Sequence, residues 1–358
     1  MGEKVFMKGC EAVAEAGLRA GCRFFAGYPI TPQSEVAEHV SRRMPQLTNG
    51  VVVQAESEVA AINMLYGAAS VGTRCMTSSS SCGISLMSEG IAALAMGELP
   101  AVICNFQRGG PAVGSIQPAQ QDYYQAVYAS GNGGFQMIVQ APATVQEAVD
   151  MTYEAFDLAD KYRNPCYVLL DGFIGVMMEP VIIPDPKSDE ELEAIRAGKT
   201  WATRGKKGDE RHVIICGTGV NLQGRNQEKA NMYEQWKKDE VRYEEFMTED
   251  AELILTGYGL SARVAKSAVR ILREEGYKVG MIRPKRVNPF PEIAFEKLPL
   301  EKLRGILVCE MSIPAQYGSD VARLIHGRTP VDCVLTSGGT ILDRNEVLAK
   351  ARQLYGNK

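Results

Sequence analysis

Short apolar segments alternate with longer segments of helical periodicity over residues 1–180 of this 358-residue chain. The apolar segments predict strands and the segments between them predict helices. This alternation is typical of parallel βαβ units in a sheet that is covered on both faces. The strands are expected at 22–27, 51–55, 74–79, 101–106, 136–140 and 166–171. The helices are expected at 5–20, 32–43, 57–70, 84–97, 119–130 and 144–160.

The pattern changes after residue 180. Residues 181–250 are charged and poor in apolar side chains, which predicts a linker followed by a polar amphipathic helix at 224–249. A second α/β unit is expected over 251–358, and the chain length favours two domains. Its strands are "ELILTGYG", "KVGMIRP", "GILVCEM" and "VDCVLT", and its helices are "SARVAKSAVRILREEG", 318–327 and 343–355.

The stretch "FFAGYPITPQSE" predicts a buried strand that turns directly into a helix. Thr31 has the chemistry of an N-cap, and Pro32 suits the first helical position. One interpretation is an ordinary capped turn. The other is an anion site, because a helix N-terminus presents unpaired N–H groups at the carboxyl edge of the sheet, where ligands bind in parallel folds.

A second candidate lies in "QAESEVAAINMLYGAA", where a helix is expected to begin at Ser57. The helix is apolar almost all round, which indicates burial or an interface. Glu58 shares the side of Ile62 and Leu65, so its carboxyl group is expected to be partly desolvated and suited to sharing a proton. Alternatively, Glu58 only complements the helix dipole, a role that Glu56 fills equally well. The pattern leaves both interpretations open.

A third candidate is the segment "NFQRGGPAVGSIQPAQQD", in which a strand runs straight into Arg108. The following glycines allow a close approach of backbone to a ligand, and a guanidinium group can grip a carboxylate with two hydrogen bonds. In the alternative interpretation the glycines only make a turn and Arg108 forms an ion pair. Thr31 and Arg108 follow corresponding strand ends, so together they could clasp one carboxylate, which favours docking over the capped turn.

Three further motifs are weak signals for a catalytic or nucleotide-binding site. The serine run "TSSSSCG" (77–83) lacks a nucleophile elbow and a nearby histidine, so it predicts a strand-to-helix turn packed against a ligand. The fragments "GTGVNLQG" (217–224) and "GYGLSA" (257–262) resemble nucleotide loops, but neither completes the dinucleotide fingerprint.

Composition excludes several classes of function. The formal charge of −4 argues against a nucleic-acid surface. No apolar run reaches the length of about 18 residues that a membrane span needs, and no signal peptide is evident, so a cytoplasmic protein is expected. The nine cysteines are scattered singly without a Cys-x-x-Cys pair, which favours reduced thiols over zinc or iron–sulfur ligands. His39, His212 and His326 are expected to be surface or satisfied side chains.

Four motifs in a fixed order resemble the α subunit of 2-oxoacid:ferredoxin oxidoreductases: "GYPITPQSE", "QAESEVAAINMLYGAA", "SSSSCGISLMSEGI" and "QRGGPAVGSIQPAQQDYYQA". The resemblance covers nearly the whole chain and is strongest to the branched-chain type, which acts on 3-methyl-2-oxobutanoate (2-ketoisovalerate). It implies a pyrimidine-type thiamine-diphosphate domain with a parallel sheet over 1–180, a charged linker and helical arm over 181–250, and a transketolase C-terminal-like α/β domain over 251–358.

The same resemblance assigns roles to the candidate residues. It places Thr31 and Arg108 on the substrate carboxylate. It places Glu58, rather than Glu56, on N1′ of the aminopyrimidine ring of thiamine diphosphate, where a shared proton helps to activate C2 of the cofactor. The implied reaction is the coenzyme A-dependent oxidative decarboxylation of a branched-chain 2-oxoacid, giving isobutyryl-CoA, CO2 and reduced ferredoxin.

Two absences imply that this chain is one subunit of several. A self-sufficient thiamine enzyme carries a Gly-Asp-Gly segment and a following asparagine for Mg²⁺ and diphosphate, and Asp171-Gly172-Phe173 lacks the leading glycine. Cysteines with cluster spacing are missing too. The expected partners are a thiamine-diphosphate-binding β subunit, a γ subunit and a ferredoxin-like δ subunit with the iron–sulfur clusters, in a dimer of heteromers. This chain then holds no metal and is inactive alone.

Two alternatives stay open. The same chemistry could act on 2-oxoglutarate or another 2-oxoacid, although no second cation for a second substrate carboxylate is identified. In a different class, the chain could be a non-catalytic nucleotide-binding or scaffold protein with the same α/β fold.

Overall fold

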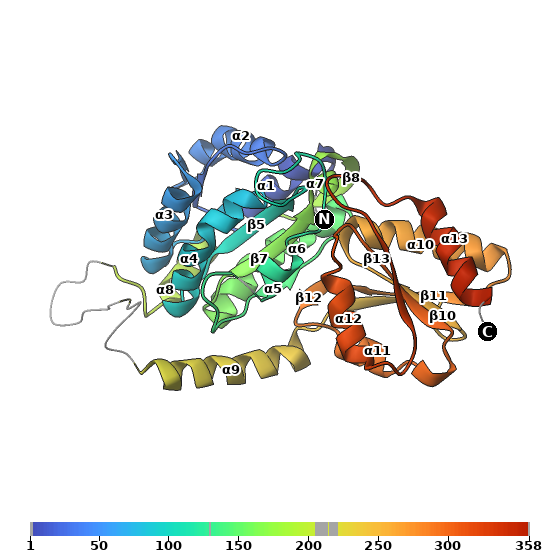
Figure 1. Cartoon of the computed structure of the whole chain (residues 1–358). Coiled ribbons are helices and arrows are strands. Elements are labelled where there is room, and N and C mark those ends of the chain that lie inside the picture. The colour runs from blue at the N-terminus through green and yellow to red at the C-terminus, as the bar shows by residue number, and fades with distance from the viewer. Residues whose placement is uncertain (1–2, 129, 205–213, 215–220, 357–358) are drawn as a thin grey trace.

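Two α/β units lie side by side in the computed structural model, which describes residues 3–128, 130–204, 214 and 221–356 (Figure 1). The larger unit is built on a seven-stranded sheet in the order β12-β6-β7-β5-β4-β2-β3, in which only β12 is antiparallel to its neighbour. Its strands are β2 (Phe24–Gly27), β3 (Val51–Gln54), β4 (Cys75–Ser79), β5 (Val102–Gln107), β6 (Ile138–Gln140), β7 (Cys166–Asp171) and β12 (Arg286–Asn288).

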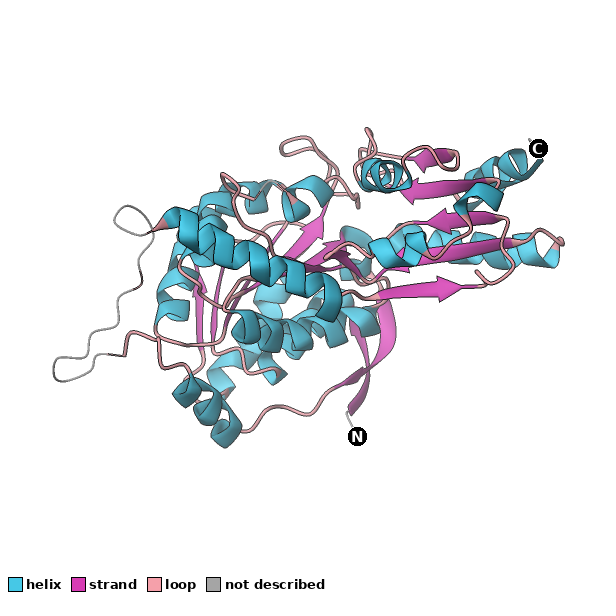
Figure 2. Cartoon of the chain, turned by 90° about the horizontal axis from the view of Figure 1, so that it is seen from below, coloured by secondary structure: helices cyan, strands magenta, loops and turns pink. Residues whose placement is uncertain are grey.

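Every residue of β4, β5 and β7 is buried, which is typical of central strands of a parallel sheet, although β4 ends in the polar residues Thr77, Ser78 and Ser79. Helices cover both faces of this sheet. A second view shows the strands of the two units as two adjacent groups with helices packed around them (Figure 2). The helices of this unit are α1 (Gly9–Arg19), α2 (Ser34–Arg43), α3 (Glu58–Ser70), α4 (Cys82–Met96), α5 (Tyr123–Val127), α6 (Val145–Tyr162), α7 (Gly172–Val176) and α8 (Asp189–Gly198).

The second unit is built on a five-stranded sheet in the order β14-β13-β10-β11-β9, with β9 antiparallel at one edge. The polar helix α9 (Leu222–Asp239) leads into it along the first unit (Figure 1). Its strands are β9 (Tyr243–Phe246), β10 (Leu253–Thr256), β11 (Val279–Pro284), β13 (Gly305–Glu310) and β14 (Val331–Leu335). Its helices are α10 (Gly259–Glu274), α11 (Glu292–Glu296), α12 (Tyr317–Ile325) and α13 (Arg344–Gly356). The α/β class and the parallel sheets expected from the sequence are confirmed.

The prediction of a helix at 5–20 is wrong for residues 5–8, which form a strand. Strand β1 (Glu3–Lys8) pairs antiparallel with β8 (Met178–Ile183), and the helix begins only at Gly9. Phe6 is 63% exposed, so the apolar residues here do not form a helical face against the core. The partner strand lies far along the chain, and pairing with it outweighs the local helical pattern.

Two other helices are shorter than expected. The helix expected at 119–130 is reduced to α5, because Gln120 is extended and donates its backbone N–H to the Met311 carbonyl of the second unit (2.9 Å). The polar helix expected at 224–249 is present as α9, but it ends at Asp239 and the chain then forms β9.

Strand β12 fastens the second unit to the first. It lies after β11 in the chain but pairs with β6 in the larger sheet. The side-chain amide of Asn288 adds a hydrogen bond to the Met137 carbonyl (2.6 Å). A segment that follows β11 of the second unit's sheet therefore forms the edge strand of the first unit's sheet.

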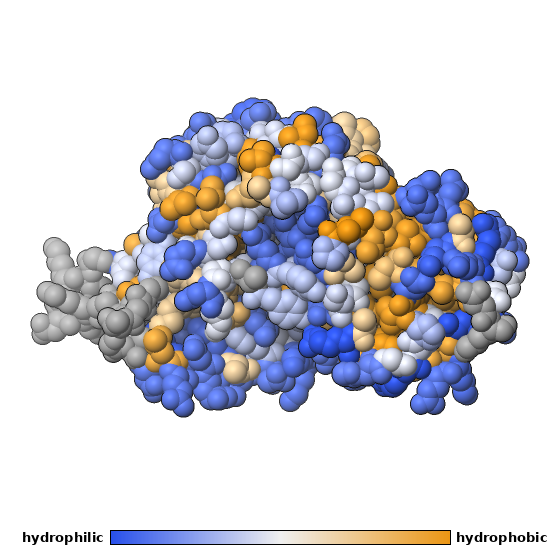
Figure 3. All heavy atoms as spheres, viewed as in Figure 1, coloured by the Kyte–Doolittle hydropathy of each residue, from blue (hydrophilic) through white to orange (hydrophobic). Residues whose placement is uncertain are grey.

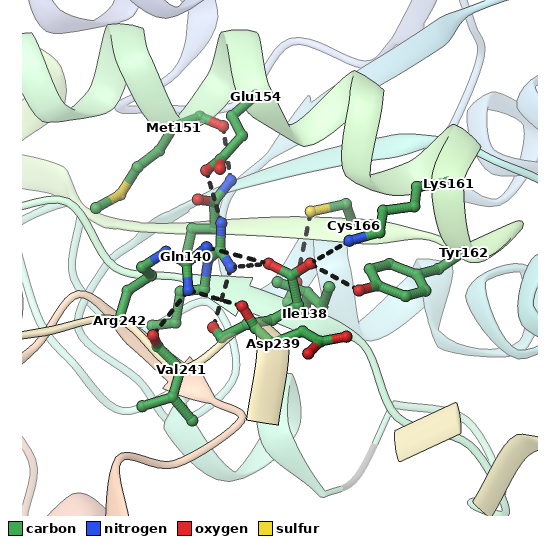
Figure 4. Close-up of polar contacts among 12 residues, drawn as sticks. Ile138, Gln140, Met151, Glu154, Lys161, Tyr162, Cys166, Asp239, Val241 and Arg242 are labelled. Atoms are coloured by element: carbon green, nitrogen blue, oxygen red, sulfur yellow. Dashed lines mark hydrogen bonds and ion pairs between the residues drawn. The ribbon is translucent and has the colours of Figure 1, made fainter. Parts of the chain in front are cut away.

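A buried ion-pair cluster stands beside this crossing strand. Arg286, 1% exposed, donates to Glu240 (2.6 Å) and to Glu154 (2.7 Å). Lys161 and Tyr162 converge on the Glu240 carboxylate from one side, at 2.8 and 2.6 Å (Figure 4). Burial alone would raise the pKa of Glu240, but the hydrogen bonds from Lys161, Tyr162 and Arg286 outweigh it and lower the pKa to about 2. The cluster binds the end of α9 to α6 and β12.

Replacing Arg286 with methionine removes the hydrogen bond to Oε2 of the buried Glu240 carboxylate and leaves that oxygen with only the 3.7 Å ion pair to Arg242. We expect Arg286→Met to lower the free energy of unfolding by roughly 3–5 kcal/mol, measured by urea denaturation at pH 7. Arg352→Met is the matched control, since its partner Glu275 lies on the surface and exposed ion pairs contribute little. The difference between Arg286→Met and the wild type should shrink as the pH falls from 4.5 toward 2, where Glu240 becomes protonated. Equal effects of the two variants would contradict this account.

Candidate active site

The candidate site residues gather at four neighbouring strand ends. In the order β5-β4-β2-β3 the strands are parallel, so their carboxyl ends share one edge of the sheet. Arg108 follows β5, Thr31 follows β2 and Glu58 follows β3, while the serine run follows β4. Residues from four separate loops are thus brought to the edge where ligands bind in parallel α/β sheets.

Thr31 is not the helix cap that the sequence predicts. Helix α2 begins at Ser34, and its N-cap is Gln33, which makes no side-chain capping bond. Gln33 instead donates to the Tyr28 carbonyl (3.2 Å) and accepts from Ser78 (2.6 Å), so it holds the loop to β4. Thr31 is therefore free of a capping role, and it lies exposed at the sheet edge.

Arg108 and Thr31 are in direct contact. The Nη1 atom of Arg108 donates to the Thr31 carbonyl (2.8 Å), and Nη2 donates to the Val113 carbonyl (3.0 Å) and to Cys82 Sγ (3.2 Å). Arg108 is 6% exposed, and its buried Nε has no hydrogen-bond partner among the described residues. No carboxylate of the described residues pairs with this guanidinium, so the ion-pair alternative is not what the structure contains.

Ser81 fixes the backbone beside Arg108. It has a positive φ of 30°, a conformation that costs a non-glycine residue about 1–3 kcal/mol. Its hydroxyl donates to Asp122 (2.6 Å) and accepts from the Arg108 N–H (2.9 Å), and its own N–H is held by Asn105 (3.0 Å). Burial raises the pKa of Asp122, and the hydrogen bonds from Ser81 and Asn105 oppose that rise. The strained turn is thus stabilised by hydrogen bonds to three groups: the Asp122 carboxylate, the Arg108 N–H and the Asn105 amide.

Glu58 is the first residue of α3, whose N-cap Ser57 accepts from the Ala60 N–H (3.1 Å). The expected burial is confirmed, since Glu58 is 5% exposed. No side chain or backbone group of the described residues forms a hydrogen bond or ion pair with its carboxyl group. Glu56 is exposed and lies before the helix. Of the two carboxyl groups, only that of Glu58 is both desolvated and available to a ligand.

Two glycines of α4 let α3 pack closely enough to enclose this carboxyl group. A Cβ atom at Gly83 would lie 2.6 Å from Glu58 Oε1 and closer still to Ser79 Oγ. A Cβ atom at Gly90, two turns further along α4, would overlap the Ile62 side chain. Glu58 and Ile62 are one turn apart on α3, so the two glycines form a groove for that helix face.

The first turn of α4 links the two halves of the site. Cys82 contacts Arg108, and the next residue, Gly83, contacts Glu58. The acid and the guanidinium therefore lie on either side of one helix N-terminus. Sequence reasoning singled out Thr31, Glu58 and Arg108 but missed these two residues of the turn.

The Ser81–Asp122–Asn105 network was also missed. One signal was available: Asn105 is a fully buried amide inside the apolar strand "AVICNFQ", and buried amides require partners. The expected strand-to-helix turn at the serine run is confirmed, with β4 ending at Ser79 and α4 beginning at Cys82.

The glycine fragment at 257–262 has a structural role at the junction of the two units. Leu260 N–H donates to Asp171 (2.7 Å), while Ser261 donates to Gln120 (2.6 Å). Burial raises the pKa of Asp171 to about 6 despite the N–H donors around it. Of the fragment at 217–224, residues 217–220 lie outside the described residues, and residues 221–224 form the N-cap and the start of α9.

The remaining sequence expectations concern metals, thiols and membranes. Eight described cysteines are unpaired thiols, and six of these are buried; Cys216 lies outside the described residues, as does His212. His39 is satisfied by Glu15 (2.9 Å) and His326 is exposed, as expected. Among the residues that the structure describes, no cluster of three or more His, Cys, Asp or Glu side chains could hold a metal ion. No helix in the described ranges is both long and apolar enough to cross a bilayer.

The fold defines a transketolase-like α/β chain. A split-gene transketolase matches it with a TM-score of 0.58 at 13% identity, covering 98% of each chain, which shows the fold alone. Two family models specify the class further: "pyruvate flavodoxin/ferredoxin oxidoreductase, thiamine diphosphate-binding" over residues 15–248, and "pyruvate:ferredoxin oxidoreductase core domain II" over 251–347. The chain belongs to this thiamine-diphosphate-binding family of 2-oxoacid:ferredoxin oxidoreductases.

Relatives of similar length narrow the comparison. The ketoisovalerate oxidoreductase subunit VorB of Methanothermobacter thermautotrophicus is 44% identical over 98% of both chains. The 2-oxoglutarate synthase subunit KorA of Methanocaldococcus jannaschii is 36% identical over 97% of this chain and 98% of its own. A solved 2-oxoglutarate:ferredoxin oxidoreductase from Magnetococcus marinus has a TM-score of 0.83 at 25% identity, covering 99% of this chain and 66% of that one.

The groove at Gly83 can be tested by filling it. Gly83→Ala should lower the free energy of unfolding by about 1–3 kcal/mol, because the new methyl group displaces Glu58 and Ser79. Gly67→Ala is the control, since a methyl group at that α3 position meets nothing within 4 Å and should stabilise the helix slightly. Thermal unfolding of the full chain measures both. A neutral Gly83→Ala would show that α3 and α4 are not closely packed there.

Proposed function

We propose that this chain is the α subunit of a thiamine-diphosphate-dependent oxidoreductase that decarboxylates a branched-chain 2-oxoacid and passes the electrons to ferredoxin. The observation that carries the proposal is the Glu58 carboxyl group, buried and without a partner at the sheet edge that also holds Arg108. The name of VorB, a ketoisovalerate oxidoreductase subunit at 44% identity, supports 2-ketoisovalerate as the substrate. The proposed products are isobutyryl-CoA, CO2 and reduced ferredoxin.

The residues present fit one half of the cofactor. A desolvated carboxyl group that no protein group occupies suits the ring nitrogen N1′ of the aminopyrimidine, with which it can share a proton. The described residues offer no acidic cluster for Mg²⁺, so a thiamine-diphosphate-binding β subunit is proposed to hold the metal and the diphosphate. A γ subunit and a ferredoxin-like δ subunit with iron–sulfur clusters complete the proposed assembly, a dimer of such heteromers located in the cytoplasm.

Each site residue then has a task. When bound, thiamine diphosphate supplies a carbon nucleophile at C2 and an electron sink for decarboxylation. Glu58 would hold the aminopyrimidine ring at N1′ and share a proton with that atom. Arg108 and Thr31 bind the substrate carboxylate, which places the keto carbon next to the cofactor. The unpaired Nε of Arg108 leaves hydrogen-bonding capacity for that carboxylate.

The loop after Arg108 favours an apolar substrate. Val113 and Ile116 are 71% and 57% exposed, and no Lys or Arg other than Arg108 makes a hydrogen bond to the described residues 109–117. A branched aliphatic side chain can contact these residues, whereas 2-oxoglutarate would bring a second carboxylate without a cation. The KorA relatives keep 2-oxoglutarate as the second candidate substrate.

Helices α3 and α4 also present a surface to the proposed β subunit. Val59 of α3 and Leu86 of α4 are 47% and 56% exposed, and Figure 3 shows apolar side chains among polar ones on the face that carries these helices. Residues 57–70 were expected to be buried or to form an interface, and α3 has one buried and one exposed face. A partner that covers the exposed face would enclose the site from outside.

Replacing the acid with its amide tests the catalytic role. In the reconstituted complex, Glu58→Gln should slow exchange of the C2 proton of bound cofactor by at least about a hundredfold, because an amide cannot share the proton. NMR of quenched samples measures the exchange, and gel filtration checks that the subunits still assemble. Glu56→Gln is the matched control, since Glu56 is exposed. Wild-type exchange in Glu58→Gln would refute the assignment.

Removing the guanidinium tests the substrate site. We expect Arg108→Ala to raise the KM for 3-methyl-2-oxobutanoate by roughly ten- to a hundredfold, the range expected for hydrogen bonds to a charged group. Steady-state rates with a low-potential dye measure the effect, and a panel of 2-oxoacids run in parallel compares substrates. A higher kcat/KM for 2-oxoglutarate than for the branched substrate would overturn the substrate assignment, and an unchanged KM in the variant would remove Arg108 from the site.

A further inference from the structure

A second buried group beside Glu58 lacks a partner. Ser79 is fully buried at the end of β4, and its hydroxyl makes no hydrogen bond to any described residue. The neighbouring hydroxyls are all engaged: Ser78 with Gln33 (2.6 Å), Ser80 with the Phe106 carbonyl (2.7 Å) and Ser81 with Asp122. A buried hydroxyl without a partner costs about 1–3 kcal/mol, so its position calls for a function.

Gly83 brings this hydroxyl and the acid to one place. Ser79 Oγ and Glu58 Oε1 both lie within 2.6 Å of a single point, the position that a Cβ of residue 83 would occupy. Both side chains are at least nine-tenths buried, one as a donor and the other as an acceptor, and neither has a competing partner in the described chain. No other group of the described residues holds the Glu58 carboxyl group, so it is available to this hydroxyl.

We propose that Ser79 is a positioning residue that donates its hydroxyl hydrogen to the Glu58 carboxylate, and that Gly83 keeps the space in which the two meet. The proposal rests on the proposed function of Glu58. The hydrogen bond orients one carboxylate oxygen toward α4 and leaves the other free for the ring nitrogen of the cofactor.

A stability cycle in the full chain, without cofactor, tests the contact. Ser79→Ala should lower the Tm by about 2–4 °C in the wild-type background. The same change should have no effect in a Glu58→Met background, because methionine keeps the volume of the side chain but removes the acceptor. Ser80→Ala is the matched control and should lower the Tm equally in both backgrounds, since its partner is the Phe106 carbonyl. Equal losses for Ser79→Ala in both backgrounds would overturn the proposal.

Cofactor activation in the reconstituted complex gives the second test. Ser79→Ala should slow C2 proton exchange about tenfold, with the KM for the 2-oxoacid unchanged. The acid limb of its pH–rate profile should move up by about one pH unit, because the bond to the ionised form is lost. Ser80→Ala should leave that profile in place. An unchanged profile in Ser79→Ala would overturn the positioning role.

The two proposals fail in different ways. If Glu58→Gln keeps normal exchange, the function proposed for Glu58 is wrong. Suppose instead that Glu58→Gln abolishes exchange of the C2 proton, but Ser79→Ala exchanges at the wild-type rate and lowers the Tm equally in the wild-type and Glu58→Met backgrounds. In that case only the role proposed for Ser79 is wrong.

Discussion

The parallel pairing of β5, β4, β2 and β3 is the constraint on which the site depends. Strands that run in one direction end at one edge, so loops from distant parts of the sequence must meet there. The central strands are buried on both faces, which fixes their register and therefore the height of each loop above the sheet. Glu58 and Arg108 come within reach of one helix turn for this reason, although 50 residues separate them.

Buried ion pairs stabilise the junction of the two units, whereas the charged side chains of the site, Arg108 and Glu58, form no ion pair among the described residues. Arg283 is 5% exposed and binds both oxygens of Glu147 across the units, at 2.7 and 2.5 Å, and Arg286 is similarly enclosed beside Glu240. Each of these buried arginines is held by two carboxylates, although Nε of Arg286 has no hydrogen-bond partner among the described residues. The paired hydrogen bonds make the geometry of the two guanidinium groups specific. The site shows the opposite arrangement, with a buried acid and a buried hydroxyl that have no partner.

Local sequence signals predicted most of the fold, and they singled out the candidate residues Thr31, Glu58 and Arg108 that the structure brings to one edge of the sheet. Glu58 was identifiable because a serine cap and an apolar helix face are both local patterns, and Arg108 because it ends an apolar strand. The errors have long-range causes. Strand β1 depends on pairing with β8, and Gln120 is drawn away from a helix by the second unit. The helix cap predicted at Thr31 is wrong. Gln33, whose side chain accepts a hydrogen bond from Ser78 of β4, occupies the N-cap position instead.

The Glu58 carboxyl group keeps one oxygen without a partner even when Ser79 donates to the other, and this has a physical consequence for assembly. A polar group that is desolvated without a partner destabilises the isolated chain, and α3 can bury its carboxyl group only because Gly83 and Gly90 admit the helix so closely. Any group that pairs with this acid recovers the lost free energy. A cofactor ring held by a neighbouring polypeptide would do so, and binding of cofactor and binding of the partner chain would then reinforce one another, since each completes the surroundings that the other needs.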